Sequence, residues 1–220
     1  SIGEMAAGIA HEINNPLTAV IGFAQLLMDA KIPDDTKKDI AVIYKEAQRA
    51  AEVAKNLLVF ARKREPARQL TDINGAIREV LKLRDYEQRV NNIQVNTRFA
   101  RELPAVMADY SQLQQVFINI IINAETAMLE AHNGGKLTIT TQKVNNTIRI
   151  SFTDNGPGIA KENLERVFDP FFTTKEVGKG TGLGLSLCHG IVVQHGGRIY
   201  ARSKLGTGAT FVVELPVNAQ

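Results

Sequence analysis

The sequence has no tryptophan, a single cysteine and no apolar run that approaches the ~18 residues needed to cross a membrane. Cys188 cannot form an internal disulfide, which excludes a disulfide-stapled secreted fold and fits a reducing compartment. Its place in a predicted helix indicates ordinary packing. An excess of one charge is also lacking, because 26 basic residues face 23 acidic ones. A dispersed net charge of +3 gives no indication of a nucleic-acid partner.

The rest of the composition is typical of a soluble globular protein, with 44% hydrophobic and 22% charged residues. A chain of 220 residues has room for two modest domains or one large one. The sequence opens inside a helical pattern, so we expect an upstream part to be missing. We expect a cytoplasmic fragment, with any membrane anchor in that upstream part.

The first 61 residues show two stretches of helical periodicity, one from Ile2 to about Lys31 and one after a break at 31–34. Two such helices cannot bury both apolar stripes on each other alone, which predicts a homodimer forming a four-helix bundle. A monomeric hairpin covered by a second domain is the alternative. The stripes consist of Ile2, Met5, Ile9, Ile13, Leu17, Val20, Ala24 and Leu27, and of Ile40, Ile43, Ala47, Ala50, Ala54, Leu57 and Ala61.

A cationic cluster and Pro66 follow the second helix. Cations at a helix C-terminus are favourable in any protein, so the cluster is most simply a solvated cap, whereas Pro66 indicates a boundary. We place a hinge at about 64–69, between an N-terminal helical domain at 1–65 and a second domain at 70–220.

The second domain mixes helix and strand signals. Asp72 resembles an N-cap, and Asp109 with Gln112 predicts a capping box that opens a long apolar helix at 110–131. Alternating apolar residues predict a strand at 93–99 and two hairpins, one before and one after the stretch at 154–185. The expected fold is a mixed sheet covered by helices on one face, an α/β sandwich. The hairpins are predicted at 137–152 and 198–215.

The stretch from 154 to 185 is the most informative. The isolated carboxylate of Asp154 precedes Gly156 and Gly158, an aromatic run follows, and the stretch closes on GTGLG at 180–184. Glycine lacks a Cβ, so its backbone can approach a ligand and direct N–H groups at phosphate oxygens. A helix from Leu183 onward would begin at those phosphates. For 180–184 alone a mobile loop is the alternative, and the pattern fits neither a Rossmann fingerprint nor a P-loop.

With two glycine clusters, a carboxylate and an aromatic run in this order, the sequence resembles the ATP-binding domain of sensor histidine kinases. That domain belongs to the Bergerat-type α/β sandwiches, with the gyrase-type ATPases and the Hsp90 chaperones. The resemblance implies that Asp154 accepts a hydrogen bond from the adenine amino group, that Gly156 and Gly158 shape the pocket, and that 159–179 forms a lid. It also implies ATP-binding roles for Lys175, which would reach the γ-phosphate unless it is only an exposed loop lysine, and for Thr210 near adenine. The phosphates would be held by Gly180, Thr181, Gly182, Leu183 and Gly184.

The octet AHEINNPL, from Ala10 to Leu17, is similar to the phosphoacceptor box of the same kinases. A lone helical histidine indicates little, but the resemblance implies that His11 takes the γ-phosphoryl group and that Glu12 is its base. The imidazole must be neutral, because imidazolium has no lone pair. Asn15, one turn from His11, matches an amide that serves phosphatase activity in the family; a local turn role near Pro16 is the alternative.

Asn119 and Asn123 are four residues apart, so both amides lie on one face of the predicted helix. They resemble the N box, in which Asn123 ligates Mg²⁺ through its carbonyl oxygen and Asn119 supports the metal and phosphate shell. The gyrase and Hsp90 relatives carry glutamate at the position of Asn119 to activate water. An amide cannot take that proton, which favours phosphoryl transfer over hydrolysis. The sequence lacks the basic residue that many relatives carry after Asn123, and we expect Glu125 to point outward.

The expected protein is therefore an ATP- and Mg²⁺-dependent histidine autokinase. It would phosphorylate His11, pass the phosphoryl group to an aspartate of a response-regulator receiver domain, and dephosphorylate that regulator. Two alternatives remain at this point: a scaffold that binds nucleotide only as a conformational signal, and an ATPase of the gyrase type.

Overall fold

The computed structural model describes residues 2–61, 67–175 and 180–217, including their side chains except at 2–12, 52–53 and 55–61. Its internal contacts divide the chain into two compact units, one up to Arg64 and one from Glu65 onward. Each unit is described by itself.

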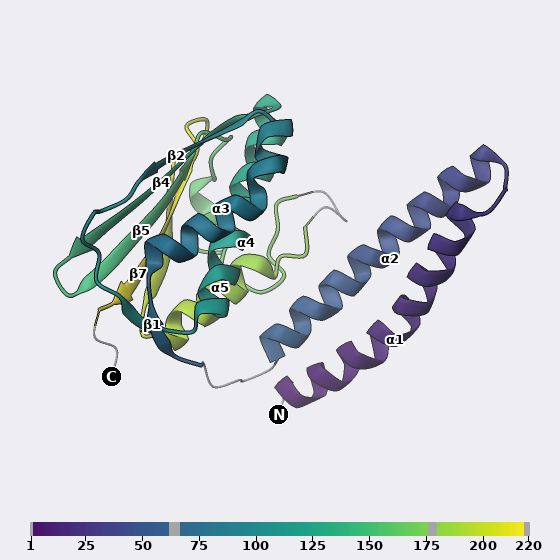
Figure 1. The fold of residues 1–220 in the computed structure, drawn as a ribbon, viewed down its shortest axis with the longest axis horizontal. Helices are drawn as coiled ribbons and strands as arrows, with labels where there is room; N and C mark the ends of the chain where they lie inside the picture. The colour runs from purple at the N-terminus through teal and green to yellow at the C-terminus, as the bar shows by residue number, and fades with distance from the viewer. Residues whose placement is uncertain (1, 62–66, 176–179, 218–220) are drawn as a thin grey trace. The chain divides into compact units, whose positions relative to one another are not determined.

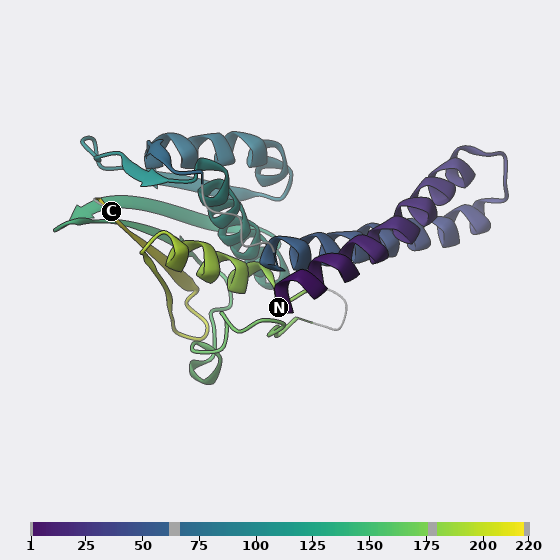
Figure 2. The ribbon, with the colours of Figure 1, turned by 90° about the horizontal axis from the view of Figure 1, so that it is seen from below.

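The first unit is a helical hairpin of α1 (Ile2–Asp29) and α2 (Asp34–Ala61), which lie side by side (Figures 1 and 2). The helices break at 30–33, where the sequence predicts it, and α2 begins with two aspartates that favour the positive end of its dipole. α1 continues through Pro16. No helix among the residues described here is long and apolar enough to cross a membrane.

Among the described side chains of the hairpin, some residues of the two predicted apolar stripes are buried and others are exposed. Ala24 of α1 and Ile40, Ala47 and Ala54 of α2 are buried, and the small alanines allow the two helices to approach closely. Other large residues of the stripes stay about half exposed, namely Ile13, Val20, Leu27 and Ile43. The hairpin therefore buries only part of its apolar surface within one chain.

The second unit is an α/β sandwich whose five-stranded sheet has the order β2-β4-β5-β7-β6 (Figure 1). The β2–β4 pair is parallel and the other neighbours are antiparallel, so the sheet is mixed as predicted. The strands are β2 (Ile93–Arg98), β4 (Gly135–Val144), β5 (Thr147–Asp154), β6 (Arg198–Ser203) and β7 (Ala209–Pro216). The helices are α3 (Ile73–Val90), α4 (Tyr110–His132) and α5 (Gly184–Gln194), with a short 3₁₀ turn, η1 (Lys161–Asn163).

The helices cover one face of this sheet, which explains the alternation seen in the sequence (Figure 1). A row of paired residues, Ile139, Phe152 and Phe211, runs across three strands on the covered face. Phe117 of α4 packs on that row, with its ring centroid 5.9 Å from that of Phe152. The core of the unit is thus centred on α4, the helix that carries the two asparagines.

Two features of the sheets were not predicted. β1 (Gln69–Thr71) pairs antiparallel with β3 (Val106–Ala108) in a separate two-stranded sheet. The edge strand β6 carries Tyr200 between Arg198 and Arg202, whose guanidinium groups lie 5.1 and 5.2 Å from its ring centroid.

The capping box at the start of α4 is half confirmed. The Asp109 carboxylate accepts a hydrogen bond from the Gln112 N–H at 3.1 Å, as predicted. The second bond of the capping box, from the Asp109 N–H to the Gln112 side chain, was wrongly predicted. The Asp109 N–H donates instead to Nε2 of His195 at 2.9 Å. Within the described part of the chain, Oε1 of Gln112 is buried without a hydrogen-bond partner.

Candidate functional site

Asp154 lies at the end of β5 and is only 5% exposed. Its Oδ1 accepts hydrogen bonds from the N–H groups of Gly156, at 2.9 Å, and Ala209, at 3.2 Å. Burial raises the pKa of this carboxyl group, and the two N–H donors partly oppose that rise. Its Oδ2 makes no hydrogen bond to the residues that the structure describes, so it can accept one from a ligand.

Glycines close the backbone around this carboxylate. Gly158 has a φ of +76°, and a Cβ there would collide with the carbonyl oxygen of Lys204. Gly208 has a φ of +89°, and a Cβ there would collide with the Asp154 carbonyl oxygen. Both positions therefore require glycine. The sequence predicted Gly158 as a site residue but did not predict Gly208, for which the Gly-Thr-Gly turn just before β7 was the available signal.

The two asparagines of α4 differ in their contacts. Asn119 is engaged on both sides: its oxygen accepts from Nε2 of Gln115 at 2.9 Å, and its amide nitrogen donates to the Gly184 carbonyl at 3.4 Å. Asn123 is half-buried and makes no hydrogen bond to any described residue. Its carbonyl oxygen is a hard donor that fits Mg²⁺, whereas Asn119 ties α4 to the first residue of α5.

The segment 180–184 leads directly into α5. Leu183 is the N-cap residue and provides no side-chain capping bond, and a Cβ at Gly184 would meet nothing within 4 Å. Thr181 accepts a hydrogen bond from the Leu183 N–H through its hydroxyl at 3.3 Å. No side chain caps the N–H groups at the start of α5, an arrangement that favours phosphate.

The lid predicted at 159–179 is described up to Lys175, and 176–179 lie outside the described residues. Phe171 adopts a φ of +66°, its N–H donates to the Gly182 carbonyl at 3.0 Å, and its side chain is 65% exposed. Phe168 instead packs edge-on against Phe211 of the core. Phe168 therefore anchors this segment to the core, whereas the ring of Phe171 does not.

Lys175 and Thr210 flank the glycine segments. Lys175 is partly buried next to Gly180, and burial lowers the pKa of its ammonium group while Glu130 opposes that shift. It is therefore not a fully exposed loop lysine. The Thr210 hydroxyl forms a hydrogen bond with that of Thr153 at 3.0 Å on the neighbouring strand.

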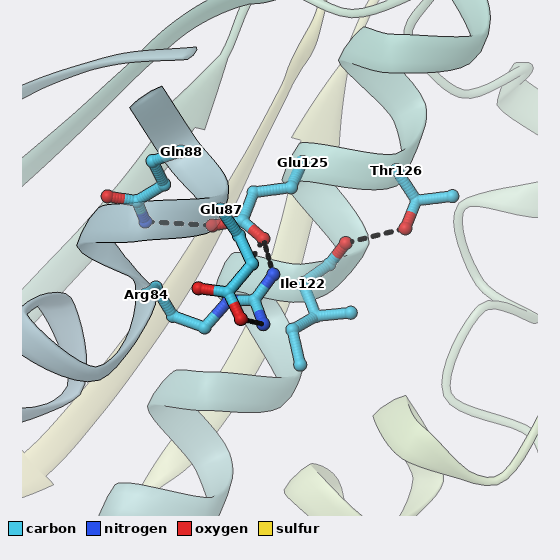
Figure 3. A network of polar contacts seen from close by, with 6 residues as sticks. All are labelled: Arg84, Glu87, Gln88, Ile122, Glu125 and Thr126. Carbon is cyan, nitrogen blue, oxygen red and sulfur yellow. Dashed lines mark hydrogen bonds and ion pairs between the residues drawn. The ribbon is translucent and has the colours of Figure 1, made fainter. Parts of the chain in front are cut away.

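The expectation that Glu125 points outward is wrong. Glu125 is 4% exposed and lies against α3, where Nη2 of Arg84 is 2.7 Å from one carboxylate oxygen and Nε2 of Gln88 is 2.7 Å from the other (Figure 3). Glu87 lies beside the same guanidinium group at 3.7 Å. Arg84 neutralises the Glu125 carboxylate, which therefore ties α4 to α3 and does not face solvent.

Cys188 confirms the packing interpretation, because burial raises the pKa of its thiol to about 12. A shallow hollow of about 440 Å³ lies elsewhere, between the lid base, α5 and β6, and includes Phe168, His189 and Tyr200. It contains none of the predicted site residues. We regard the bare backbone around Asp154 and Gly184 as the site, because that is where the free donors and acceptors are.

The predicted residues of the helical hairpin lie near the N-terminal end of α1. Asn15 is exposed, whereas the side chains of His11 and Glu12 lie outside the described residues. In the second unit, α4 borders the rest of the site: Ala127 approaches Gly156, and Asn119 contacts Gly184. The structure thus brings Asp154, Asn123 and the start of α5 around one helix.

Two family models match the chain. Residues 1–66 match the His Kinase A (phospho-acceptor) domain, and residues 108–219 match the histidine kinase-, DNA gyrase B- and HSP90-like ATPase. The chain belongs to the sensor histidine kinases. Its fold, a helical hairpin followed by an α/β sandwich ATPase domain, agrees with that family.

This histidine kinase is similar to curated proteins of the family. It is 38% identical to the sensor kinase CckA of Brucella abortus (strain 2308), over 98% of this chain and 24% of the relative. It is also 38% identical to the sensor histidine kinase ZraS of Escherichia coli (strain K12), over 99% of this chain and 46% of the relative. The chain therefore spans less than half the length of these two relatives.

Solved structures of the family resemble this chain over most or all of its length. Full-length ShkA in complex with AMPPNP has a TM-score of 0.83 at 26% identity, over 99% of this chain and 47% of that one. ThkA in complex with the response regulator protein TrrA has a TM-score of 0.72 at 34% identity, over 99% and 62% of the two chains. The catalytic domain of ThkA alone is 36% identical, with a TM-score of 0.62, over 69% of this chain and 99% of that one.

Proposed function

We propose that this chain is the core of an ATP-dependent histidine autokinase. The observation that carries the proposal is the pairing of a buried carboxylate that keeps one oxygen free, at Asp154, with an uncapped helix start at Gly184. The first suits the adenine amino group and the second suits phosphates. The match to the ATPase family and the AMPPNP bound to the related ShkA support ATP as the nucleotide.

Within this proposal each residue has a role. Asp154 binds adenine, with Gly156, Gly158 and the Thr153–Thr210 pair shaping the pocket. The backbone from Gly180 to Gly184 binds phosphates, and Lys175 approaches the γ-phosphate from the lid. Asn123 holds Mg²⁺, which when bound would neutralise phosphate charge during transfer. Asn119 positions α5 through its hydrogen bond to the Gly184 carbonyl. As an amide it cannot take a proton from water, which favours phosphoryl transfer over hydrolysis.

The acceptor in this proposal is His11 of α1, with Glu12 as its base. Incubation with γ-labelled ATP should give a base-stable, acid-labile label on the wild type and none on the His11→Ala variant. The expected loss is complete, because no other residue replaces the attacking nitrogen. Label that persists on His11→Ala would mean that another residue is the acceptor, whereas steady phosphate release without any label would favour the gyrase-type ATPase. Nucleotide binding with neither reaction would favour the scaffold.

We propose a response-regulator receiver domain as the partner, because ThkA was solved in complex with the response regulator TrrA. The chain would pass its phosphoryl group to an aspartate there. It would also remove it again, with the exposed Asn15 amide orienting water. Replacing Asn15 with alanine should then slow dephosphorylation of a labelled receiver domain while leaving the label on His11; equal rates for both proteins would exclude this role for Asn15.

We further propose a domain boundary at about 64–69, which the division of the chain into two compact units supports.

We also propose a homodimer through the hairpin. The support is apolar surface left exposed on both helices, which includes Phe23 at 68%, Leu26 at 67% and Ile43 at 52%. Replacing Ile43 with glutamate should convert dimers into monomers in sedimentation equilibrium. Lys45→Glu makes a larger charge change at an exposed polar position of the same helix, and it should remain dimeric. A wild type that is monomeric at micromolar concentration would contradict the proposal.

A further inference from the structure

His195 is a buried histidine at the C-terminal end of α5 for which the sequence suggested no role. It is 2% exposed, and both ring nitrogens have partners. Nε2 lies 2.9 Å from the Asp109 backbone nitrogen, and Nδ1 lies 2.8 Å from the Ile191 carbonyl oxygen. A backbone N–H can only donate, so Nε2 is the acceptor and Nδ1 carries the proton. The geometry therefore fixes a neutral ring with one tautomer.

Asp109 connects this ring to the segment that enters the second unit. One Asp109 carboxylate oxygen caps α4 through the Gln112 N–H, and the other accepts from the Ala67 N–H at 3.0 Å. Arg68 donates to the Gln194 carbonyl at 2.9 Å, next to His195. The first residues of the second unit are thus bonded both to the start of α4 and to the end of α5.

The same two helices are joined again at the opposite end of α5. There Asn119 of α4 donates to the carbonyl of Gly184, and between the two ends the Cys188 thiol lies 3.7 Å from the Val116 carbonyl. As the chain runs from Gly184 to His195 along α5, its partners on α4 run back from Asn119 to Asp109. The two helices are therefore antiparallel, and His195 and Gly184 are the two ends of one rigid element about 16 Å long.

We propose that His195 is a positioning residue for the nucleotide pocket. Its bond to the Asp109 N–H sets the position of α5 along α4, and so fixes the phosphate-binding residues at the far end of α5 against Asn119. Without that bond, the polar contacts described above between α4 and α5 are the long ones of Asn119 with Gly184, at 3.4 Å, and of Cys188 with Val116, at 3.7 Å, which allow α5 to shift lengthwise. The role rests on the proposed function in assigning phosphates to Gly184, but the placement of α5 can be measured without nucleotide.

The first test uses the wild-type chain and ¹⁵N NMR. The spectrum should show a His195 ring with the proton on Nδ1 and an unprotonated Nε2 coupled to the Asp109 amide. A proton on Nε2 would overturn the proposal. In a His195→Leu variant, which fills the space without an acceptor, the amide signals of Gly184 and the Asn119 side chain should also shift. Unchanged signals at both places in folded protein would overturn it as well.

The second test measures affinity for AMPPNP with Mg²⁺ by calorimetry, at a temperature where circular dichroism shows each protein folded. His195→Leu should bind about tenfold more weakly, the order expected when a buried N–H loses its acceptor. His195→Gln places an oxygen within reach of the same N–H and should restore most of the affinity. The exposed Val193 on the same helix provides the control, and Val193→Ala should match the wild type.

The outcomes separate positioning from mere stability. A merely structural role predicts a lower melting temperature and unchanged affinity in the folded protein, which would overturn the proposal. Equal weakening in the leucine and glutamine variants would also overturn it, because only one of them lacks the acceptor. If the wild type binds no nucleotide, the proposed function fails, whereas the shifts at Gly184 still decide whether His195 positions α5.

Discussion

Replacing Asp154 with alanine will weaken ATP binding on the order of 100-fold, because a hydrogen bond to a charged, desolvated acceptor contributes up to about 3 kcal/mol. The variant removes the acceptor for the adenine amino group and also the oxygen that holds the Gly156 and Ala209 N–H groups. Isothermal calorimetry with AMPPNP measures the loss. Phosphorylation of His11 should fall with it, since the substrate no longer occupies the pocket.

Two controls make this prediction specific. Asp85→Ala removes an exposed carboxylate, 59% exposed on α3, and should leave the affinity unchanged. Asp154→Asn keeps the size of the side chain but turns one oxygen into a donor that faces another donor, so it should bind as poorly as the alanine variant. An asparagine variant with normal affinity would mean that adenine is recognised elsewhere.

The pH dependence of binding follows from the same carboxylate. Its pKa is raised from 3.8, so it takes up a proton at a higher pH than an exposed aspartate does. Binding needs the ionised form, because a proton on the free oxygen would oppose the adenine amino group. Affinity should therefore be complete well above the raised pKa and be lost as the pH falls through it. Binding that is insensitive to acidification until the protein unfolds would contradict this assignment.

Replacing Arg84 with alanine will destabilise the second unit by about 3 kcal/mol, since it leaves the Glu125 carboxylate buried without its cation. Glu125 would keep only the Gln88 amide as a partner (Figure 3). Arg84 itself is 22% exposed at its side chain, so water can partly replace it and the loss should lie at the low end for a buried pair. Urea unfolding followed by circular dichroism measures the change.

The contrast with an exposed ion pair tests the cause. Lys82 and Glu79 lie on the same helix with side chains 73% and 54% exposed, so Lys82→Ala should change stability by less than ~1 kcal/mol. Replacing all three polar partners together, as Arg84→Met, Gln88→Leu and Glu125→Leu, should recover most of the loss, because no buried charge remains unpaired. A triple variant as unstable as Arg84→Ala would mean that packing, not charge, holds α3 to α4.

Much of the fold follows from local patterns in the sequence. Helical periodicity predicts α1 and α2, alternation predicts the hairpins of the sheet, and the mixed sheet covered on one face is confirmed. The pairing of β1 with β3 was missed because three-residue strands are too short to show a period of two. The pair is stabilised by a hydrogen bond from the Thr71 hydroxyl to the Ala108 carbonyl and by the burial of Val106 and Ala108 in the core of the unit.

The site was predictable where its chemistry is local in sequence. Asp154 and the glycines that follow it form one continuous signal, whereas Ala209 reaches the same carboxylate from 55 residues away. Glu125 was wrongly placed for the same reason, because Arg84 is 41 residues earlier. His195 and Asp109 are 86 residues apart. Side chains that meet through the fold leave no spacing from which to infer their contact.

The edge strand β6 affects whether copies of this kinase core aggregate at high concentration. A free strand edge can recruit another chain and start a continuous sheet. Arg198 and Arg202 hold their cationic groups over Tyr200 on this strand, so an approaching copy would meet like charges at both ends of the edge. Edge-to-edge joining of copies through β6 into insoluble filaments is thereby disfavoured.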